Sequence, residues 1–164
     1  MKYFLFEGSI TLEATDKLIE WVCSTEGELT ISLDSPGGDT LYAALIKRCF
    51  EQNKDRITLI AGTIILSTAF EIFRSFTGKR AMIYYCKGMY HKCYQAITTD
   101  GSNKPVDSSN ACSKINLKCL VQRDLQIAES FMNKTELNKF KRGDDVFFDF
   151  DRMKEIFPYV EIIY

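Results

Sequence analysis

Four short runs of strand-forming residues occur in the first half of this 164-residue chain, separated by helical patterns. The runs lie at 3–6, 29–33, 57–61 and 81–85; the second alternates apolar with polar residues and the third is rich in β-branched ones. In the three segments between them, apolar residues return every three or four positions, as on one face of a helix. Strands that alternate with helices fold in parallel and are joined by right-handed crossovers. We therefore expect an α/β fold of repeated strand-helix crossover units with mostly parallel strands.

The helical segments carry start signals, stop signals and apolar stripes. Thr11 is expected to cap the first helix, whose stripe includes Leu18 and Val22. Ser67 lies near the start of the third helix, which we expect after a strand that stops at Gly62. The inner face of the second helix is predicted at Leu41, Ala44, Leu45 and Cys49.

The pattern changes beyond Met89. Residues 98–110 are polar and predict an exposed loop, and the apolar spacing from there to Met132 predicts a long C-terminal amphipathic helix. A charged link then leads to Asp149, the expected cap of a short helix that precedes a terminal strand at 159–163. Because no repeat or linker is visible, we expect residues 1–164 to form a single domain.

Charge and hydropathy exclude several classes of partner. The chain has 21 Lys and Arg against 22 Asp and Glu, so no basic excess favours nucleic acid. Its apolar runs are far too short to cross a membrane, and residues 1–6 are too short for a signal-peptide core. We therefore expect a cytoplasmic protein with neither nucleic acid nor membrane as its partner.

The six cysteines show neither zinc-site nor redox-motif spacing, because no pair forms a C-x-x-C motif. Without a signal peptide, buried free thiols are expected rather than disulfides. Cys86, His91 and Cys93 would supply three metal ligands, but no fourth is evident, so we expect no metal and no other cofactor.

Two turns between a strand and a helix carry residues suited to chemistry. Ser35–Gly38 (Ser-Pro-Gly-Gly) would point several backbone N–H groups at one anion or oxyanion, or it would simply be a turn. Ser67 at a helix start is either a capping residue or an acyl nucleophile. His91, the only histidine, is either structural or a general base.

With these motifs in this order, the chain resembles the Clp protease proteolytic subunit and its relatives in the crotonase-like superfamily, as a divergent member. The similarity covers roughly residues 3–93 and continues more weakly near 110–132 and 147–163. It rests on five stretches, at Phe4–Ile10, Ser35–Gly38, Ala61–Ser67, Gly78–Arg80 and Met89–His91.

The resemblance implies a role for each matching residue. Ser67 would be the nucleophile and His91 the general base, and the backbone N–H groups of Gly38 and Thr68 would form the oxyanion hole. Gly37 and Gly38 would contact the substrate, which in this family is a peptide or an unfolded protein.

The chain departs from the family pattern at the nucleophile and at the acid. Counting from Gly62 instead of Gly38 puts Leu66 in the nucleophile position. Lys141 stands where the family has its orienting Asp, with Asp144 and Asp145 three and four residues further on as substitutes.

These features favour a Clp-type serine endopeptidase that works through an acyl-enzyme. The family and the aromatic content indicate a homo-oligomer, whereas a partner ATPase is not supported. The alternative is a catalytically inactive homologue that serves as an assembly or scaffold subunit. A crotonase-type acyl-CoA enzyme is a third hypothesis, disfavoured by the short chain and by the serine–histidine pair.

The cysteine interpretation predicts a simple chemical result. Thiol titration of the denatured, unreduced protein is expected to find six free groups. Two or more absent thiols would contradict the expected reducing compartment.

Overall fold

The computed structural model describes residues 2–92 and 122–164. It contains two compact units, a sheet unit of residues 1–90 and 147–164 and a second unit of residues 91–146. The strands are β1 (Lys2–Glu7), β2 (Leu29–Ser35), β3 (Ile57–Leu66), β4 (Lys79–Ile83), β5 (Lys87–Tyr90), β6 (Val146–Phe148) and β7 (Glu161–Ile163). The helices are α1 (Leu12–Ser24), α2 (Thr40–Gln52), α3 (Thr68–Ser75), residues 122–129, α5 (Lys134–Arg142) and α6 (Phe150–Ile156). The single domain stays a prediction.

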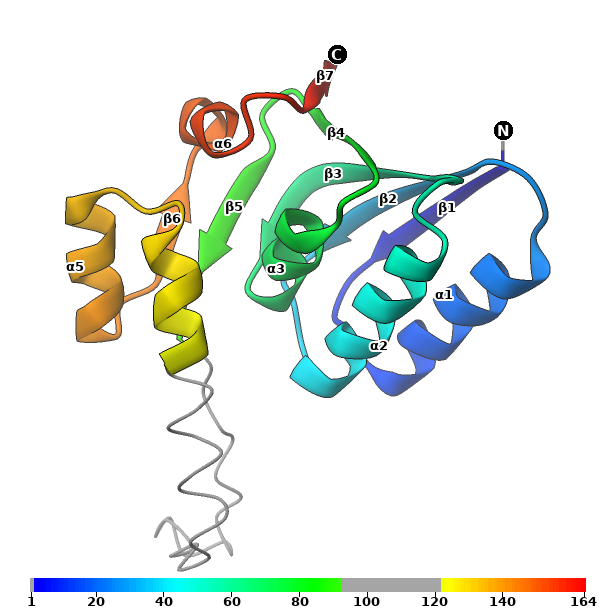
Figure 1. The fold of residues 1–164 in the computed structure, drawn as a ribbon, viewed down its shortest axis with the longest axis horizontal. Coiled ribbons are helices and arrows are strands. Elements are labelled where there is room, and N and C mark those ends of the chain that lie inside the picture. Colours follow the sequence, from blue (N-terminus) through cyan, green and yellow to red (C-terminus); the bar gives the residue numbers. More distant parts are fainter. Residues whose placement is uncertain (1, 93–121) are drawn as a thin grey trace, which may run out of the picture. The chain divides into compact units, whose positions relative to one another are not determined.

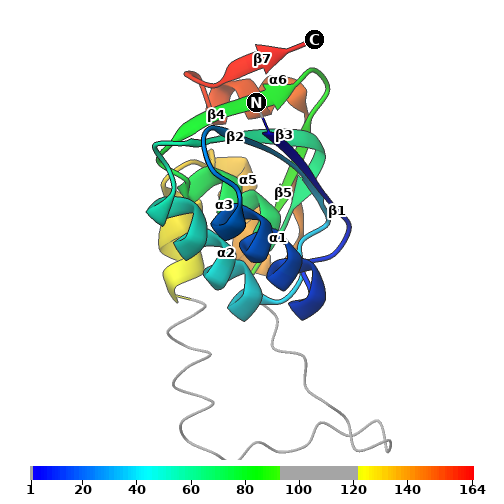
Figure 2. The same ribbon diagram turned by 90° about the vertical axis from the view of Figure 1, so that its right-hand side faces the viewer.

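The sheet confirms the predicted α/β class. Its main path runs β1-β2-β3-β4-β7, and each neighbouring pair on this path is parallel. Helices α1, α2 and α3 lie together on one face of these strands (Figures 1 and 2). The predicted caps are present, because Thr11 accepts a hydrogen bond from the Ala14 N–H and Asp149 accepts one from the Arg152 N–H.

Strand β3 is longer than the sequence predicts. The expected end at Gly62 is wrong, because β3 continues to Leu66 through an irregularity in its pairing with β2. Leu33 pairs with Ala61, but Ser35 pairs with Ile65, so β3 has two extra residues between these pairs. Before the bulge β3 pairs with β4, and after it with β5.

An aromatic cluster fixes α3 against the sheet. Phe70 is fully buried, and its ring lies 5.4–5.9 Å between centroids from the rings of Tyr90, Phe148 and Phe157. Rings at this separation add directional contacts to their hydrophobic burial. Ser67, the residue that follows β3, therefore leads into a helix that is firmly packed against the sheet.

The predicted inner face of α2 is right for Cys49, which is buried, and wrong for its other three residues. Leu41 and Leu45 are 66% and 42% exposed, and Ala44 is exposed as well. The buried face consists of Ala43, Ile46, Cys49 and Phe50. The predicted face and the buried face both have helical spacing. The face that packs into the core is the one that contains the aromatic and β-branched residues.

The charged link before Asp149 contains a helix that the sequence interpretation omitted. Asn133 and Glu136 form a capping box at the start of α5, and Gly143 ends this helix in a left-handed conformation. Two short strands, β5 and β6, were also omitted; they pair with each other. Of the predicted long helix, residues 122–129 are helical; its earlier part and the polar loop lie outside the described residues.

Three cysteines fall within the described residues, and all are free thiols. Cys49 and Cys86 are buried, whereas Cys23 is exposed. Burial raises the pKa of Cys49 to about 11, with Cys23 adding to the effect, and raises that of Cys86 to about 12, with the Asp34 charge adding to it. Both buried thiols are therefore neutral and unreactive near pH 7. The other three cysteines lie outside the described residues.

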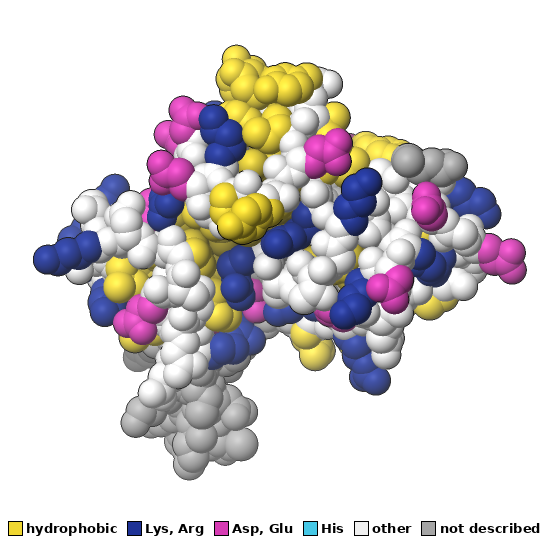
Figure 3. Space-filling view, turned by 45° about the horizontal axis from the view of Figure 1, so that its top comes forward, with side chains coloured by type: hydrophobic (Ala, Val, Ile, Leu, Met, Phe, Trp, Pro, Cys, Tyr) yellow, Lys and Arg dark blue, Asp and Glu magenta, His cyan; other side chains and the backbone are white. Residues whose placement is uncertain are grey.

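No helix in the described ranges is both long and apolar enough to span a membrane. On the face shown in Figure 3, hydrophobic side chains reach the surface among charged ones. In the sheet unit the exposed Tyr84, Tyr85 and Tyr164 form an aromatic cluster with the half-buried Phe150, in which Tyr84 contacts the other three rings.

The raised thiol pKa values predict alkaline destabilisation. In the unfolded chain both thiols ionise near pH 9, but in the folded chain only near 11 and 12, so their stabilising effect is complete below pH 9. As the pH rises from 9 through 11–12, that effect is lost. We expect the free energy of unfolding, measured with denaturant, to fall less steeply above pH 9 in Cys49→Ala/Cys86→Ala than in the wild type. An equal fall of the unfolding free energy with pH in both proteins would show that folding does not raise the pKa values of these thiols.

Candidate active site

The two turns singled out in the sequence lie side by side in the sheet unit. The Gly38 N–H donates a 2.9 Å hydrogen bond to Thr68 Oγ1. A Cβ atom at Gly37, whose φ is +93°, would lie 2.7 Å from the Leu66 carbonyl oxygen and 2.8 Å from the Ser67 Cβ. Only glycine tolerates both this conformation and this approach. The glycine turn and the Ser67 turn are therefore in direct contact.

Ser67 occupies a strained turn between β3 and α3. Its backbone angles are φ 55° and ψ −122°, a region that side-chain-bearing residues rarely adopt. The residue stands at the N-cap position of α3, but its side chain makes no capping hydrogen bond. A sharp strand-to-helix turn that carries a serine in this geometry is the form that nucleophile elbows take.

The backbone resolves the ambiguity between Leu66 and Ser67 as the turn residue. Leu66 is the last residue of β3 and pairs with Met89 in β5. Ser67 follows it, and its N–H donates a 2.8 Å hydrogen bond to the Met89 carbonyl oxygen. Ser67, and not Leu66, therefore has the strained backbone.

Asp34 supports this turn from the neighbouring strand. Its carboxylate accepts hydrogen bonds from the Thr63 N–H at 2.9 Å and the Ile64 N–H at 3.2 Å, both within the bulge of β3. Gly62 is closely packed against it, because a Cβ there would lie 2.8 Å from the Asp34 side chain. The sequence analysis assigned no role to Asp34, since nothing local marks an aspartate that bonds to a strand 30 residues away.

The two N–H groups predicted to form the oxyanion hole, those of Gly38 and Thr68, differ in their hydrogen bonding. The Gly38 N–H is engaged by Thr68 Oγ1, which also contacts the Gly38 carbonyl oxygen at 3.3 Å. Within the described chain, the Thr68 N–H makes no backbone hydrogen bond, as expected for the first residue of a helix. Thr68 is buried. An oxyanion would find one open donor and one donor already satisfied by a hydroxyl group.

In the second unit, His91 has Asp145 as its carboxylate neighbour. The distance from His91 Nδ1 to Asp145 Oδ1 is 3.6 Å, an ion-pair separation somewhat longer than a hydrogen bond. Asp144 is instead paired with Arg142 at 3.0 Å. Lys141, the residue at the family's acid position, pairs with Glu129 at 3.4 Å. Of the two candidate acids, Asp145 is thus the one beside the imidazole.

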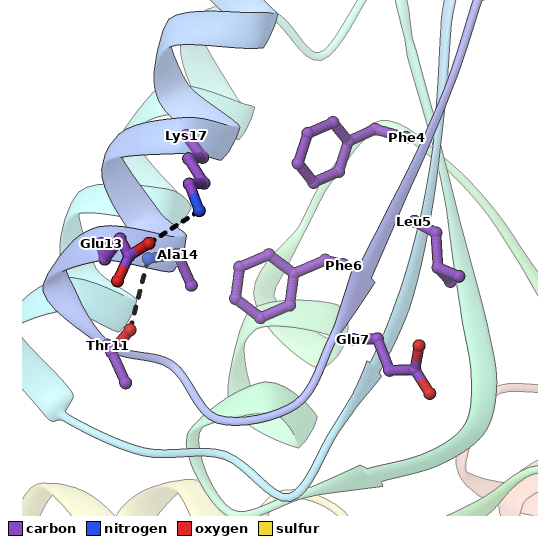
Figure 4. A pocket seen from close by; sticks show the side chains of 8 residues that line it. All are labelled: Phe4, Leu5, Phe6, Glu7, Thr11, Glu13, Ala14 and Lys17. Atoms are coloured by element: carbon purple, nitrogen blue, oxygen red, sulfur yellow. Dashed lines mark hydrogen bonds and ion pairs between the residues drawn. The ribbon is translucent and has the colours of Figure 1, made fainter.

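A shallow groove runs beside β1 in the sheet unit, with a volume of about 340 Å³. Figure 4 shows Phe4 and Phe6 pointing from β1 toward α1, where Glu13 and Lys17 form a 2.7 Å ion pair. The groove is lined by Phe4, Leu5, Phe6, Glu7, Thr11, Glu13, Ala14 and Lys17. It holds no nucleophile or general base of the predicted chemistry.

Within the described residues no group of three His, Cys, Asp or Glu side chains is placed to hold a metal ion. Cys93, the third member of the weighed metal set, lies outside those residues.

No family model matches the sequence, and no curated protein matches it. A match among solved structures is a mutant form of ClpP1 from Listeria monocytogenes, with a TM-score of 0.72 and 16% identity. The match covers 99% of this chain and 91% of that chain. The chain therefore has the ClpP fold, as the motifs predicted, and at this identity the likeness establishes the fold alone.

The support that Asp34 gives to the bulge predicts a measurable loss of stability. Asp34→Ala leaves two backbone N–H groups without their charged acceptor, so we expect the free energy of unfolding to fall by about 2–3 kcal/mol. Asp34→Asn keeps one acceptor oxygen and is expected to cost about half as much. Asp16→Ala, an exposed aspartate on α1, is the control and is expected to change stability by less than about 0.5 kcal/mol. An Asp34→Ala variant as stable as this control would contradict the role.

Proposed function

We propose that the protein is a serine peptidase of the Clp type that cleaves peptides or unfolded protein segments through an acyl-enzyme. The observation that carries the proposal is the strained backbone of Ser67 at the turn between β3 and α3. Such strain costs free energy and persists where the surrounding contacts enforce it, often because function requires it. Here those contacts are the Asp34 carboxylate, the Met89 carbonyl and the buried Phe70 ring.

The proposed reaction begins with attack of Ser67 Oγ on the carbonyl carbon of a peptide bond. His91 takes the hydroxyl proton and passes it to the leaving amine, and water then releases the acyl group by the reverse path. The oxyanion binds to the N–H groups of Gly38 and Thr68. The positive end of the α3 dipole stabilises the same charge.

Asp145 is proposed as the orienting acid. Its place on the Nδ1 side of His91 favours the tautomer with a proton on Nδ1, which leaves Nε2 as the base. It also stabilises the imidazolium that forms during the reaction. The 3.6 Å separation is compatible with this role, since catalytic contacts often shorten only when substrate binds.

An inactive scaffold subunit is the second candidate. The hydrogen bond between the Gly38 N–H and the Thr68 hydroxyl favours it, because this contact occupies a donor that catalysis needs. Both functions fit a homo-oligomer in the cytoplasm. The exposed leucines of α2 and the exposed aromatic cluster supply apolar area for contacts between copies.

A fluorophosphonate probe is expected to label the wild type in its native assembly, and Ser67→Ala is expected to abolish both labelling and peptide cleavage. The folded stability of this variant is expected to be nearly unchanged, because the hydroxyl does not cap α3. Ser75→Ala, at the other end of α3, is the matched control and is expected to keep full activity. A wild type that neither labels nor cleaves would favour the scaffold instead.

The base and the acid are tested by variants in the same assay. His91→Ala is expected to stop cleavage, and combining it with Ser67→Ala is expected to add little, because both residues act in one step. Asp145→Asn is expected to lower the rate of labelling by more than about tenfold. Asp144→Asn is its matched control, since Asp144 is paired with Arg142, and a loss as large as that of Asp145→Asn would contradict the assignment.

A further inference from the structure

We infer that Thr68 is a positioning residue that holds the oxyanion-binding amide of Gly38 and must release it before Ser67 can be acylated by a substrate. The inference rests on the proposed peptidase function and adds a control point to it. Its basis is the pair of contacts that the Thr68 hydroxyl makes with the Gly38 N–H and carbonyl oxygen, at 2.9 and 3.3 Å.

The Gly38 peptide is fixed on both sides, so it cannot turn away from the hydroxyl. The Ile10 N–H donates to the Gly37 carbonyl oxygen at 2.9 Å, and the Asp39 N–H donates to the Ile10 carbonyl oxygen at 3.1 Å. A Cβ at Gly38 would meet the Ile10 backbone, which allows no other residue there. The direction of the Gly38 N–H is therefore set before any ligand arrives.

The Thr68 hydroxyl oxygen occupies the position that an oxyanion would take on this amide. Donors of an oxyanion hole lie 2.7–3.1 Å from the oxygen they bind. The hydroxyl is 2.9 Å from the Gly38 nitrogen, within that range. An N–H group has one proton to donate, so substrate and hydroxyl compete for it.

The side chain can leave without moving the helix. Thr68 is the first residue of α3, and its hydroxyl is held by contacts with Gly38 alone among the described residues. A change of the side-chain torsion therefore frees the amide while α3 stays packed through Phe70. No covalent bond is made or broken at Thr68 in this step.

The consequence is a slower acylation of Ser67. Each turnover begins by exchanging the internal hydrogen bond for one to the substrate, so the gain from the Gly38 donor is reduced by the hydrogen bond given up. An ordinary net hydrogen bond corresponds to a rate factor on the order of tenfold.

The test measures the second-order rate constant of fluorophosphonate labelling in the native assembly. In that reaction Ser67 Oγ bonds to phosphorus, fluoride leaves and the phosphonyl oxygen takes the oxyanion position. Thr68→Ala removes the competing hydroxyl and is expected to label about tenfold faster. Thr68→Ser keeps the hydroxyl and is expected to label at nearly the wild-type rate.

Two further variants separate this role from a structural one. Thr68→Val keeps the shape of the side chain but puts a methyl group where the hydroxyl was, so labelling is expected to be slower than in Thr68→Ala. Thr15→Ala removes the same atoms from another buried threonine, on α1, and is expected to leave the labelling rate unchanged. Slower labelling in Thr68→Ala than in the wild type would overturn the inference, as would an equal rate.

Hydrogen exchange at the Gly38 amide, followed by NMR, tests the contact without any activity. The amide is expected to exchange slowly in the wild type and in Thr68→Ser, and faster in Thr68→Ala. Equal exchange in all three would overturn the inference even if Ser67 labels. Faster exchange in Thr68→Ala without Ser67-dependent labelling of any variant would confirm the contact, overturn the proposed peptidase function and with it the role of Thr68 in acylation.

Discussion

The carboxylate of Asp34 is the interaction on which the geometry of the site depends. The bulge in β3 turns the N–H groups of Thr63 and Ile64 away from the regular ladder, and Asp34 accepts both. Asp34 thus supplies the acceptors for two N–H groups that the bulge takes out of the ladder. With it, β3 continues for four more residues and delivers Ser67 beside the glycine turn.

The site combines fixed and exchangeable parts. The strained Ser67 backbone, the Gly38 peptide and the packed helix α3 are held by contacts from several elements. Among the described residues, the Thr68 hydroxyl is hydrogen-bonded to Gly38 alone. In the proposed mechanism, access to the Gly38 amide depends on a single side-chain torsion within an otherwise rigid framework.

The sequence predicted most of the scaffold, because local signals carry it. Alternating strands and the side chains of Thr11 and Asp149 mark boundaries that the structure confirms. Helix α5 was omitted even though Asn133, Glu136 and Gly143 are local cap signals, since its charged composition resembled a link. The site was harder to predict from the sequence. The position of Ser67 at a helix start followed from the local pattern, but its strained backbone angles and the contact between Thr68 and Gly38 depend on residues about 30 positions away.

The change of partners along β3 has a consequence for motion. Before the bulge β3 pairs with β2 and β4, whereas after it residues 64–66 pair with β5 and Ile65 alone still pairs with β2. Proteins open locally in cooperative segments that often coincide with structural motifs. The strip formed by residues 64–66 and 87–89 shares no pairing with β4, so its opening would leave the ladder between β3 and β4 intact.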